Sequence, residues 1–275
     1  MEVFYMKRIF KGLISFILCF SLTVPAFALT ENEADKISYL NDKGFPIELL
    51  EILRPEKLNE LYIGVKDGTI LYGGTSTKKL SEEGDIVPYR QGDIDYLNVG
   101  ITHTFNMDVR DDGTAKINSV EMYVHYEWPN GKQAAINKTD TIAVNWDSSL
   151  FYATGFSAES GVFLEKGGYV ELDSWSSPAE LTQGGLGYLA ELHYGQGAVE
   201  SRVGYANFDL KARSPMYYAG TYGETYNTSV NLQYVHCDDP GNVTVGFNIG
   251  VFSVSGDISG STESTAIYTD FPYSA

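Results

Sequence analysis

The sequence is short of basic residues and of cysteine. Of its 275 residues, 19 are Lys or Arg and 36 are Asp or Glu, so the formal net charge is -17. Nucleic acids and anionic lipids are both bound through Lys and Arg, and a polyanion is therefore repelled by them. We expect no nucleic-acid partner. Cations, cationic peptides and neutral glycans remain as ligands.

The sequence also has no apolar run long enough to span a membrane. Its longest run, 13–24, falls short of the roughly 20 residues that a spanning helix needs. Three basic residues precede the run, and Ala26-Phe27-Ala28 follows it as a small-x-small cleavage site. Residues 1–28 are therefore predicted to be a signal peptide cleaved after Ala28. The protein is expected to be secreted, either extracellular or associated with the cell wall.

Cleavage would leave the chain with one cysteine and a larger negative charge. Without residues 1–28, the 19 basic and 36 acidic residues become 16 and 35, and Cys19 is lost. Cys237 alone can form neither an intramolecular disulfide nor a cysteine-based metal cluster. Secretion without disulfides is typical of a bacterial protein, and a chain of this length can bury enough surface without them.

Residues 29–64 have the pattern of three short helices. Gly44 is placed to end the first, and Pro46 and Pro55 are placed in the first turns of the next two. Segments this short are not stable alone, so they must pack together or on the rest of the chain. Apolar residues at helical spacing can supply that contact: Ile37, Leu40, Ile47, Leu50, Leu53, Leu58, Leu61 and Tyr62.

Two stretches of this segment, YLNDKGFP at 39–46 and LNELY at 58–62, carry a family resemblance. They resemble the N-terminal segment of uncharacterised secreted proteins of Gram-positive bacteria. The resemblance covers about a tenth of the chain. It implies bacterial origin and export, and it carries over no activity and no functional residue.

The remainder of the chain has the pattern of a β-protein. Residues 65–93 are rich in Gly, Ser and Thr and are interpreted as a linker with a short strand near 69–72. From 94 to 275 the apolar period is two, and no helical pattern intervenes. We therefore predict a mainly β fold, an antiparallel β-sandwich or barrel-like domain, preceded by the short α-helical N-terminal segment. Besides two hairpins, strands are expected at 141–146, 161–164, 168–175, 186–194, 199–211, 216–222 and 258–268.

The first hairpin is predicted together with its register. Apolar residues alternate along 97–109 and 120–128, and Asp112-Gly113 between them is a strong two-residue turn. With that turn as the loop, paired residue numbers sum to 225, which places Phe105 opposite Val120. Both apolar sets then lie on one face, as a half-buried sheet requires.

A second hairpin, Thr225 to Gly256, is predicted around the turn at Asp239-Pro240-Gly241-Asn242. Closing that turn places Val230 opposite Val251 and, on the same face, Leu232 opposite Ile249. The two arms are uncharged, and no Lys or Arg follows Arg213 anywhere in the chain. Arms of this length could insert into a membrane, as in a β-pore-forming protein, or lie in the core of a sandwich.

Catalytic nucleophiles are not indicated by any motif. The chain has no Gly-x-Ser-x-Gly sequence, and Cys237 and His236 are adjacent on a strand and point to opposite faces. Its four histidines, His103, His125, His193 and His236, lack metal-ligand spacing. His103 and His236 are expected on apolar faces and His125 on a polar face. The sequence therefore leans away from an enzyme.

Paired carboxylates are the main catalytic alternative. A glycosidase needs two carboxyl groups flanked by aromatic side chains that hold the sugar. Glu171 and Asp173 are two apart on a predicted strand next to Trp175, and Glu121 lies on the outer face of the first hairpin. These three are the candidate catalytic residues of a glycan-active hydrolase. A solvated strand face is the simpler explanation of the same residues.

A structural calcium ion is the only cofactor that the sequence suggests. Asp108, Asp111 and Asp112 cluster at one hairpin end, although nothing matches an EF-hand loop. Turn chemistry accounts for the same residues, because Asp favours turns. No other cofactor or metal is indicated.

Aromatic residues suggest a binding surface. Trp175, Tyr217, Tyr218 and Tyr222 could stack on sugar rings, although strand propensity alone enriches Tyr and Trp in a β-protein. We therefore predict a secreted, non-catalytic binding or cell-surface interaction protein whose extracellular ligand is a glycan or a cationic peptide. The alternatives are a β-pore-forming protein, for which a membrane would be the partner, and the glycan-active hydrolase.

Overall fold

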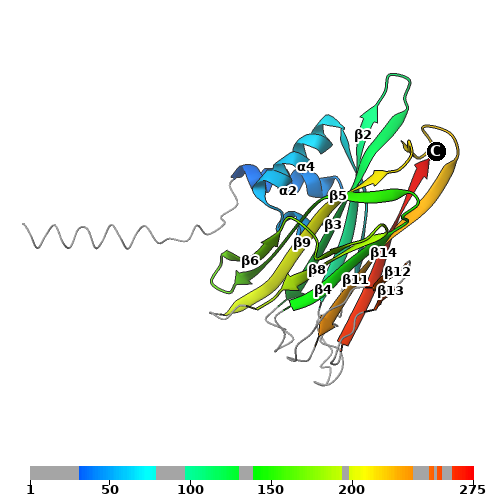
Figure 1. Cartoon of the computed structure of the whole chain (residues 1–275). Helices are drawn as coiled ribbons and strands as arrows, with labels where there is room; N and C mark the ends of the chain where they lie inside the picture. Colours follow the sequence, from blue (N-terminus) through cyan, green and yellow to red (C-terminus); the bar gives the residue numbers. More distant parts are fainter. Residues whose placement is uncertain are drawn as a thin grey trace, which may run out of the picture.

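The computed structural model describes residues 31–78, 97–129, 139–193, 198–237, 248–250, 253–255 and 262–275. Within these residues, 12 antiparallel strands form one sheet. The sheet is curled, so that its two halves face each other across one apolar core, and the helices cover the outside of one half (Figure 1). The prediction of a mainly β, antiparallel fold with a short helical N-terminal segment is confirmed.

Three helices precede the strands. The helices are α2 (Glu31–Asp42), α3 (Ile47–Leu50) and α4 (Pro55–Asp67). The strands are β1 (Ile70–Lys78), β2 (Asn98–Val109), β3 (Ala115–Pro129), β4 (Thr139–Trp146), β5 (Phe151–Leu164), β6 (Tyr169–Trp175), β7 (Glu180–Leu181), β8 (Gly185–Glu191), β9 (Val199–Ala212), β10 (Tyr217–Tyr218), β11 (Thr225–Cys237), β12 (Asn248–Gly250), β13 (Ser253–Ser255) and β14 (Thr262–Ser274). The large sheet has the order β6-β5-β9-β3-β10-β14-β11-β4-β8-β7, and β2 joins β3 and β1. None of the helices in the described part of the chain has the length and apolar content to cross a membrane. The predicted signal peptide, 1–28, lies outside the described residues.

The first hairpin, β2 with β3, has the predicted register along most of its length. Phe105 lies opposite Val120, and the pairing continues in that register to Asn98 and Glu127. The predicted two-residue turn is wrong, because Arg110 and Thr114 close a loop of three residues. A bulge at Asn118 compensates for this extra residue. The hydrophobic pattern determines the register, and the turn adapts to it.

Strand β1 is longer than the short strand predicted near 69–72. It continues to Lys78 and pairs with β2 throughout, with a bulge at Gly73. The Gly73-Gly74 pair indicated a linker, but a Cβ at Gly73 would collide with the ring of His103. Glycine is present there because another part of the chain approaches the backbone closely.

The second hairpin does not form as predicted. Strand β11 pairs with β14 on one side and with β4 on the other, so Val230 lies between Thr269 and Trp146. Leu232 likewise lies between Ile267 and Val144, not opposite Ile249. Residues 238–247 and Val251, the predicted partner of Val230, lie outside the described part of the chain. Val230 and Leu232 are fully buried in the core. The first arm of the predicted hairpin is therefore a central strand of the sheet. Its place in the core explains why it carries no charge, without membrane insertion.

Two apolar clusters hold the molecule together. The larger lies between the two halves of the sheet and includes Val124, Phe208, Leu232 and Phe271. The smaller joins the three helices to the outer face of β3 and β9, where Tyr123 and Tyr205 are buried. Fully burying one Val, Leu or Phe side chain contributes about 1.5 to 3 kcal/mol to the stability of the folded state. The helical layer also covers the polar face of β3. His125 was expected on that face, and because the helices cover it, His125 is only 5% exposed.

Candidate functional site

An open groove of about 680 Å³ runs between the first turns of α4 and the outer face of the sheet. Strands β5, β6 and β9 supply its other walls. The α4 helix begins here because Pro55 occupies its first turn, where a missing N–H costs nothing. The residues that line the groove are Arg54, Glu56, Lys57, Glu60, Ser157, Ala158, Ser174, Trp175, Ser176, Tyr205 and Asn207.

The floor of the groove is polar and hydrogen-bonded. The Ser157 hydroxyl donates to Asn207 Oδ1 at 2.5 Å, and Asn207 Nδ2 donates to Glu121 Oε1 at 3.2 Å. Asn207 is opposite both Tyr123 on β3 and Ser157 on β5 in the sheet. These contacts hold the Asn207 amide group in position at the groove floor. A ligand that binds it therefore does not have to pay the entropy cost of ordering it.

Arg54 connects the helices to two carboxylates. Its Nε donates to Glu159 Oε2 at 2.5 Å, and its terminal nitrogen lies 3.6 Å from Glu171 Oε2. The Tyr169 hydroxyl donates to the other oxygen of Glu159 at 2.8 Å. The hydrogen bond to Glu159 raises the pKa of Arg54 above its ordinary value. Glu159 is 5% exposed, so it is a buried carboxylate with both oxygens satisfied.

Lys57 makes the second such contact, with Glu121. Lys57 Nζ lies 2.5 Å from Glu121 Oε1, and the Tyr123 hydroxyl donates to Glu121 Oε2 at 2.7 Å. Burial raises the pKa of Glu121, and the nearby Lys57 ammonium opposes that rise. Both carboxylate oxygens are occupied by internal donors. Glu121 therefore links α4 to the sheet through Lys57, and Asn207 and Tyr123 donate to its two oxygens as well.

The lining of the groove is balanced in charge. Arg54 and Lys57 are matched by Glu56 and Glu60, and the remaining lining residues are uncharged. Three serine hydroxyl groups and one amide are present among them. A neutral ligand rich in hydroxyl groups matches this lining better than a strongly charged one does.

The predicted carboxylate pair lies at the margin of the groove on β6. Glu171 and Asp173 are both exposed, and a bulge at Leu172 interrupts the regular alternation between them. Glu171 lies against Arg54, while Asp173 accepts a hydrogen bond from the Ser174 backbone at 2.8 Å. Glu121 lies beneath α4 instead, where its partners are Lys57, Tyr123 and Asn207. The three candidates therefore do not form one constellation.

The aromatic candidates separate into two places. Trp175 lines the groove and also packs in part against the inner core. Tyr217 and Tyr222 stack on each other with ring centroids 4.3 Å apart, and Tyr218 packs edge-on against Phe105. Strand β10, which carries Tyr217 and Tyr218, pairs with the C-terminal end of β14, at the other end of the molecule from β6 (Figure 1).

The candidate calcium ligands lie at the β2–β3 loop. Asp112 Oδ1 accepts hydrogen bonds from the Thr114 backbone at 2.9 Å and from its hydroxyl at 2.7 Å. These bonds lower the pKa of Asp112. Asp108 is opposite Lys116 in the ladder. Across the described ranges, no three His, Cys, Asp or Glu side chains lie close enough together to hold a metal ion.

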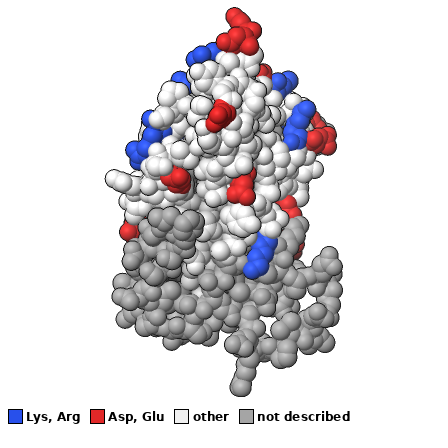
Figure 2. Space-filling model, turned by 90° about the vertical axis from the view of Figure 1, so that its right-hand side faces the viewer, with Lys and Arg blue, Asp and Glu red and all other residues white. Residues whose placement is uncertain are grey.

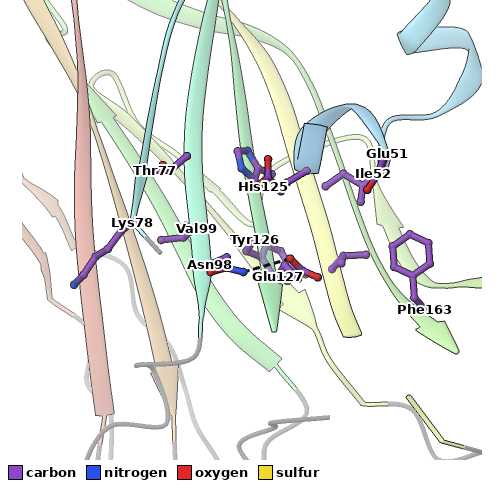
Figure 3. A pocket seen from close by; sticks show the side chains of 12 residues that line it. Glu51, Ile52, Thr77, Lys78, Asn98, Val99, His125, Tyr126, Glu127 and Phe163 are labelled. Carbon is purple, nitrogen blue, oxygen red and sulfur yellow. Dashed lines mark hydrogen bonds between the residues drawn. The ribbon is translucent and has the colours of Figure 1, made fainter. Parts of the chain in front are cut away.

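Two smaller cavities follow the same seam between helices and sheet. One, of about 190 Å³, is lined mainly by α3, the start of α4 and β5 and shares Arg54 with the groove. The other, of about 60 Å³, lies between α3 and strands β1 to β3, where Asn98 donates to Glu127 at 3.3 Å (Figure 3). Burial first, and then Glu48 and Glu127, raise the pKa of Glu51 beside it.

A buried polar network lies within the inner core. Asp140 accepts a hydrogen bond from the Tyr234 hydroxyl at 2.5 Å, and its other oxygen is 2.7 Å from His236 Nδ1. Trp128 Nε1 in turn donates to the Tyr234 oxygen at 3.0 Å. Asp140 and His236 are fully buried. His103 is also buried, as expected, with Nδ1 3.0 Å from the Thr269 hydroxyl.

Sequence reasoning missed most of the groove. Arg54, Lys57, Glu159 and Asn207 come from three segments that are far apart in the chain. The sequence offered one signal for the groove: polar residues alternate with apolar ones along β3 and β9. Such alternation predicts a face exposed to solvent, and nothing in the sequence indicates that helices cover this face.

No protein-family model matches the chain, and no curated protein matches its sequence. Among solved structures, the C-terminal domain of the Streptococcus pyogenes antigen I/II-family protein AspA is similar at 7% identity over 50% of each chain, with a TM-score of 0.29. The collagen adhesin (CNA) of S. aureus is similar at 10% identity over 76% of this chain and 81% of that one, with a TM-score of 0.27. The KRT10-binding region domain of the pneumococcal protein PsrP is similar at 10% identity, over 59% and 86%, with a TM-score of 0.23.

The chain spans half the length of the first two structures it matches. The three neighbours named above share 7 to 10% identity with this chain. A likeness at this level carries no argument about ligand or activity.

Proposed function

We propose that the protein is an exported, non-catalytic binding protein that takes a neutral glycan in the groove between α4 and strands β5, β6 and β9. The observation that carries this proposal is the groove itself, open, about 680 Å³ in volume, and lined by hydroxyl, amide and balanced charged groups with Trp175 at its margin. Sugars offer hydroxyl groups for such a lining and a ring face for an aromatic side chain.

The polar groups of the groove are already held in position. Asn207 is fixed by Ser157 and Glu121, and Arg54 and Lys57 are fixed by carboxylates. Ordering these side chains on binding therefore costs little conformational entropy. The same internal contacts occupy both oxygens of Glu121 and of Glu159, which favours binding over hydrolysis.

The experiment compares glycan-array and cell-wall pull-down binding of the protein with that of a variant whose groove is blocked. Ser174 is exposed beside the groove, so Ser174→Trp should obstruct it without disturbing the core. The matched control is Ser229→Trp, the same change at an exposed position of β11. We expect Ser174→Trp to lose the glycan signal and Ser229→Trp to keep it.

Two outcomes would contradict the proposal. Equal binding by both tryptophan variants would place the ligand elsewhere. Release of reducing sugar, abolished by Glu171→Gln or Glu121→Gln, would make the protein a glycan-active hydrolase.

A further inference from the structure

A cavity of about 190 Å³ lies between the helical layer and strands β5 and β6, and its walls are mainly apolar. Leu50, Leu53 and Leu58 line it from the helical layer and are buried. Phe163 and Tyr169 line it from the sheet, with ring centroids 5.3 Å apart and an angle of 56° between the rings. We call this space the helix cavity. An engineered apolar cavity of about 150 Å³ holds benzene, so the helix cavity has room for one hydrocarbon ring.

One end of the helix cavity is formed by an ion pair. Arg54 and Glu159 both line the cavity, and Arg54 Nε donates to one oxygen of Glu159. The Tyr169 hydroxyl donates to the other oxygen at 2.8 Å. The charges of Arg54 and Glu159 therefore offset each other, and this end presents no net charge to a ligand.

The other charged residues that line the helix cavity, Glu33 and Glu51, are both acidic. Glu51 is exposed and forms no ion pair with any residue that the structure describes. Burial, and then the nearby Glu48 and Glu127, raise the pKa of Glu51, and no described cation opposes that rise. The helix cavity therefore has an apolar interior and a carboxylate, that of Glu51, whose charge no cation of the described chain offsets.

This carboxylate lies next to the apolar wall. Glu51, Ile52 and Phe163 line both the helix cavity and the neighbouring cavity of about 60 Å³, and Figure 3 shows all three on one side of the smaller cavity. On the side of the molecule away from the helices, the described acidic and basic side chains are scattered over the surface (Figure 2). The helix cavity instead combines enclosed apolar space and negative charge in one place.

We propose that the helix cavity binds a free primary amine that carries one hydrocarbon ring, with the ring inside the cavity and the ammonium group at Glu51. Burial of the ring removes apolar surface from water, and a carboxylate beside aromatic rings selects for positive charge. The net charge of -17 also attracts a cation. The cavity encloses little more than one ring, which favours a small molecule over a longer chain. The proposal does not rest on glycan binding, because Arg54 is the one residue that lines both sites.

The test titrates the whole protein by calorimetry with three probes that share a ring and differ in charge: 2-phenylethylamine, 2-phenylethanol and phenylacetate. We expect the amine to saturate one site per chain, the alcohol to bind about two- to fivefold more weakly, and phenylacetate to show no binding. Binding of the alcohol or of phenylacetate as tight as that of the amine would overturn the proposal. A tripeptide with an N-terminal phenylalanine presents the same ring and ammonium group. If it binds at least as tightly as the free amine, the assignment to a small molecule is wrong.

Two variants locate the site by its shape. Ile52→Trp adds volume at a partly buried position of the cavity wall and should abolish binding of 2-phenylethylamine. Its matched control is Ile63→Trp, at a 47% exposed position of α4 outside the cavity, which should bind the amine as the parent does. Phe163→Ala removes one aromatic wall and should weaken binding about two- to tenfold. Unchanged binding in both Ile52→Trp and Phe163→Ala would place the amine elsewhere and overturn the proposal.

A third variant tests the charge. Glu51→Gln keeps the shape of the side chain and should weaken binding of 2-phenylethylamine about two- to fivefold, while binding of 2-phenylethanol stays the same. Glu180→Gln, the same change on β7 outside the cavity, is the control and should affect neither probe. An equal effect of Glu51→Gln on both probes would refute the role of its carboxylate. Ser174→Trp should leave amine binding intact, so a failure of the glycan groove and a failure of the helix cavity are told apart.

Discussion

The two faces of β3 show two different ways of burying a strand. On the inner face, Val120, Met122 and Val124 meet the other half of the sheet through apolar contacts alone. On the outer face, Glu121 and Tyr123 are also buried but are covered by helices and satisfied by hydrogen bonds. The inner face holds the sheet together, whereas the outer face both docks the helices and supplies the polar groups beneath the groove.

Removing an inner-face side chain should have the largest effect. Phe208 is fully buried next to Trp146, so Phe208→Ala should lower the free energy of unfolding by about 3 to 5 kcal/mol in urea titrations. The outer-layer counterpart is Leu61→Ala. It should chiefly increase amide hydrogen exchange in α2 to α4, while β3 and β9 stay protected. Equal loss of protection in both layers would show that they unfold as one unit.

Acid should weaken the inner core through His103. Burial lowers the pKa of His103 from about 6.5 to about 4. Between those values the unfolded chain binds a proton that the folded chain does not, so the free energy of unfolding falls as the pH falls from about 6.5 to about 4. The full loss is roughly 3 kcal/mol.

The pH measurement needs a reference, because carboxylates titrate in the same range. His103→Gln should lose less stability than the parent between pH values of about 7 and 4.5, in urea titrations at each pH. Parallel pH profiles for the two proteins would refute the role assigned to His103.

The outer face should respond to charge rather than to volume. Lys57→Met leaves the buried Glu121 carboxylate without its cation and should cost about 1 to 3 kcal/mol, less than a fully buried pair because the Lys57 side chain is 19% exposed. The double variant Lys57→Met, Glu121→Gln should regain most of that loss. A double-mutant cycle measures this coupling, and strictly additive losses would mean that the pair does not anchor α4.

Part of this architecture could be predicted from sequence, and the limits have physical causes. The β2–β3 register was predicted because one strand face is buried, and a one-residue slip would expose all of its apolar side chains. The same logic failed for β11, because its alternation is equally satisfied by any neighbour with the right period, and β14 is that neighbour. Turn residues near Asp239 indicated only a local reversal of the chain.

The candidate site was harder still. Trp175 was selected for its chemistry and does line the groove, but Arg54, Lys57 and Asn207 acquire their role only when α4 lies on the outer face of β9. Long-range docking of a helix on a polar strand face leaves no periodic signal. Gly73 is a similar case, since its close approach to His103 cannot be seen without the fold.

The most direct test of the glycan groove is to follow the indole signals of the protein's three tryptophans by nuclear magnetic resonance during titration with soluble cell-wall glycan fragments. Trp128 and Trp146 are 2% and 6% exposed, whereas Trp175 lines the groove. We predict that the Trp175 signal shifts and saturates while the other two stay in place, and that Ser174→Trp abolishes the shift. Saturable glycan binding that leaves the Trp175 signal unmoved would contradict the account.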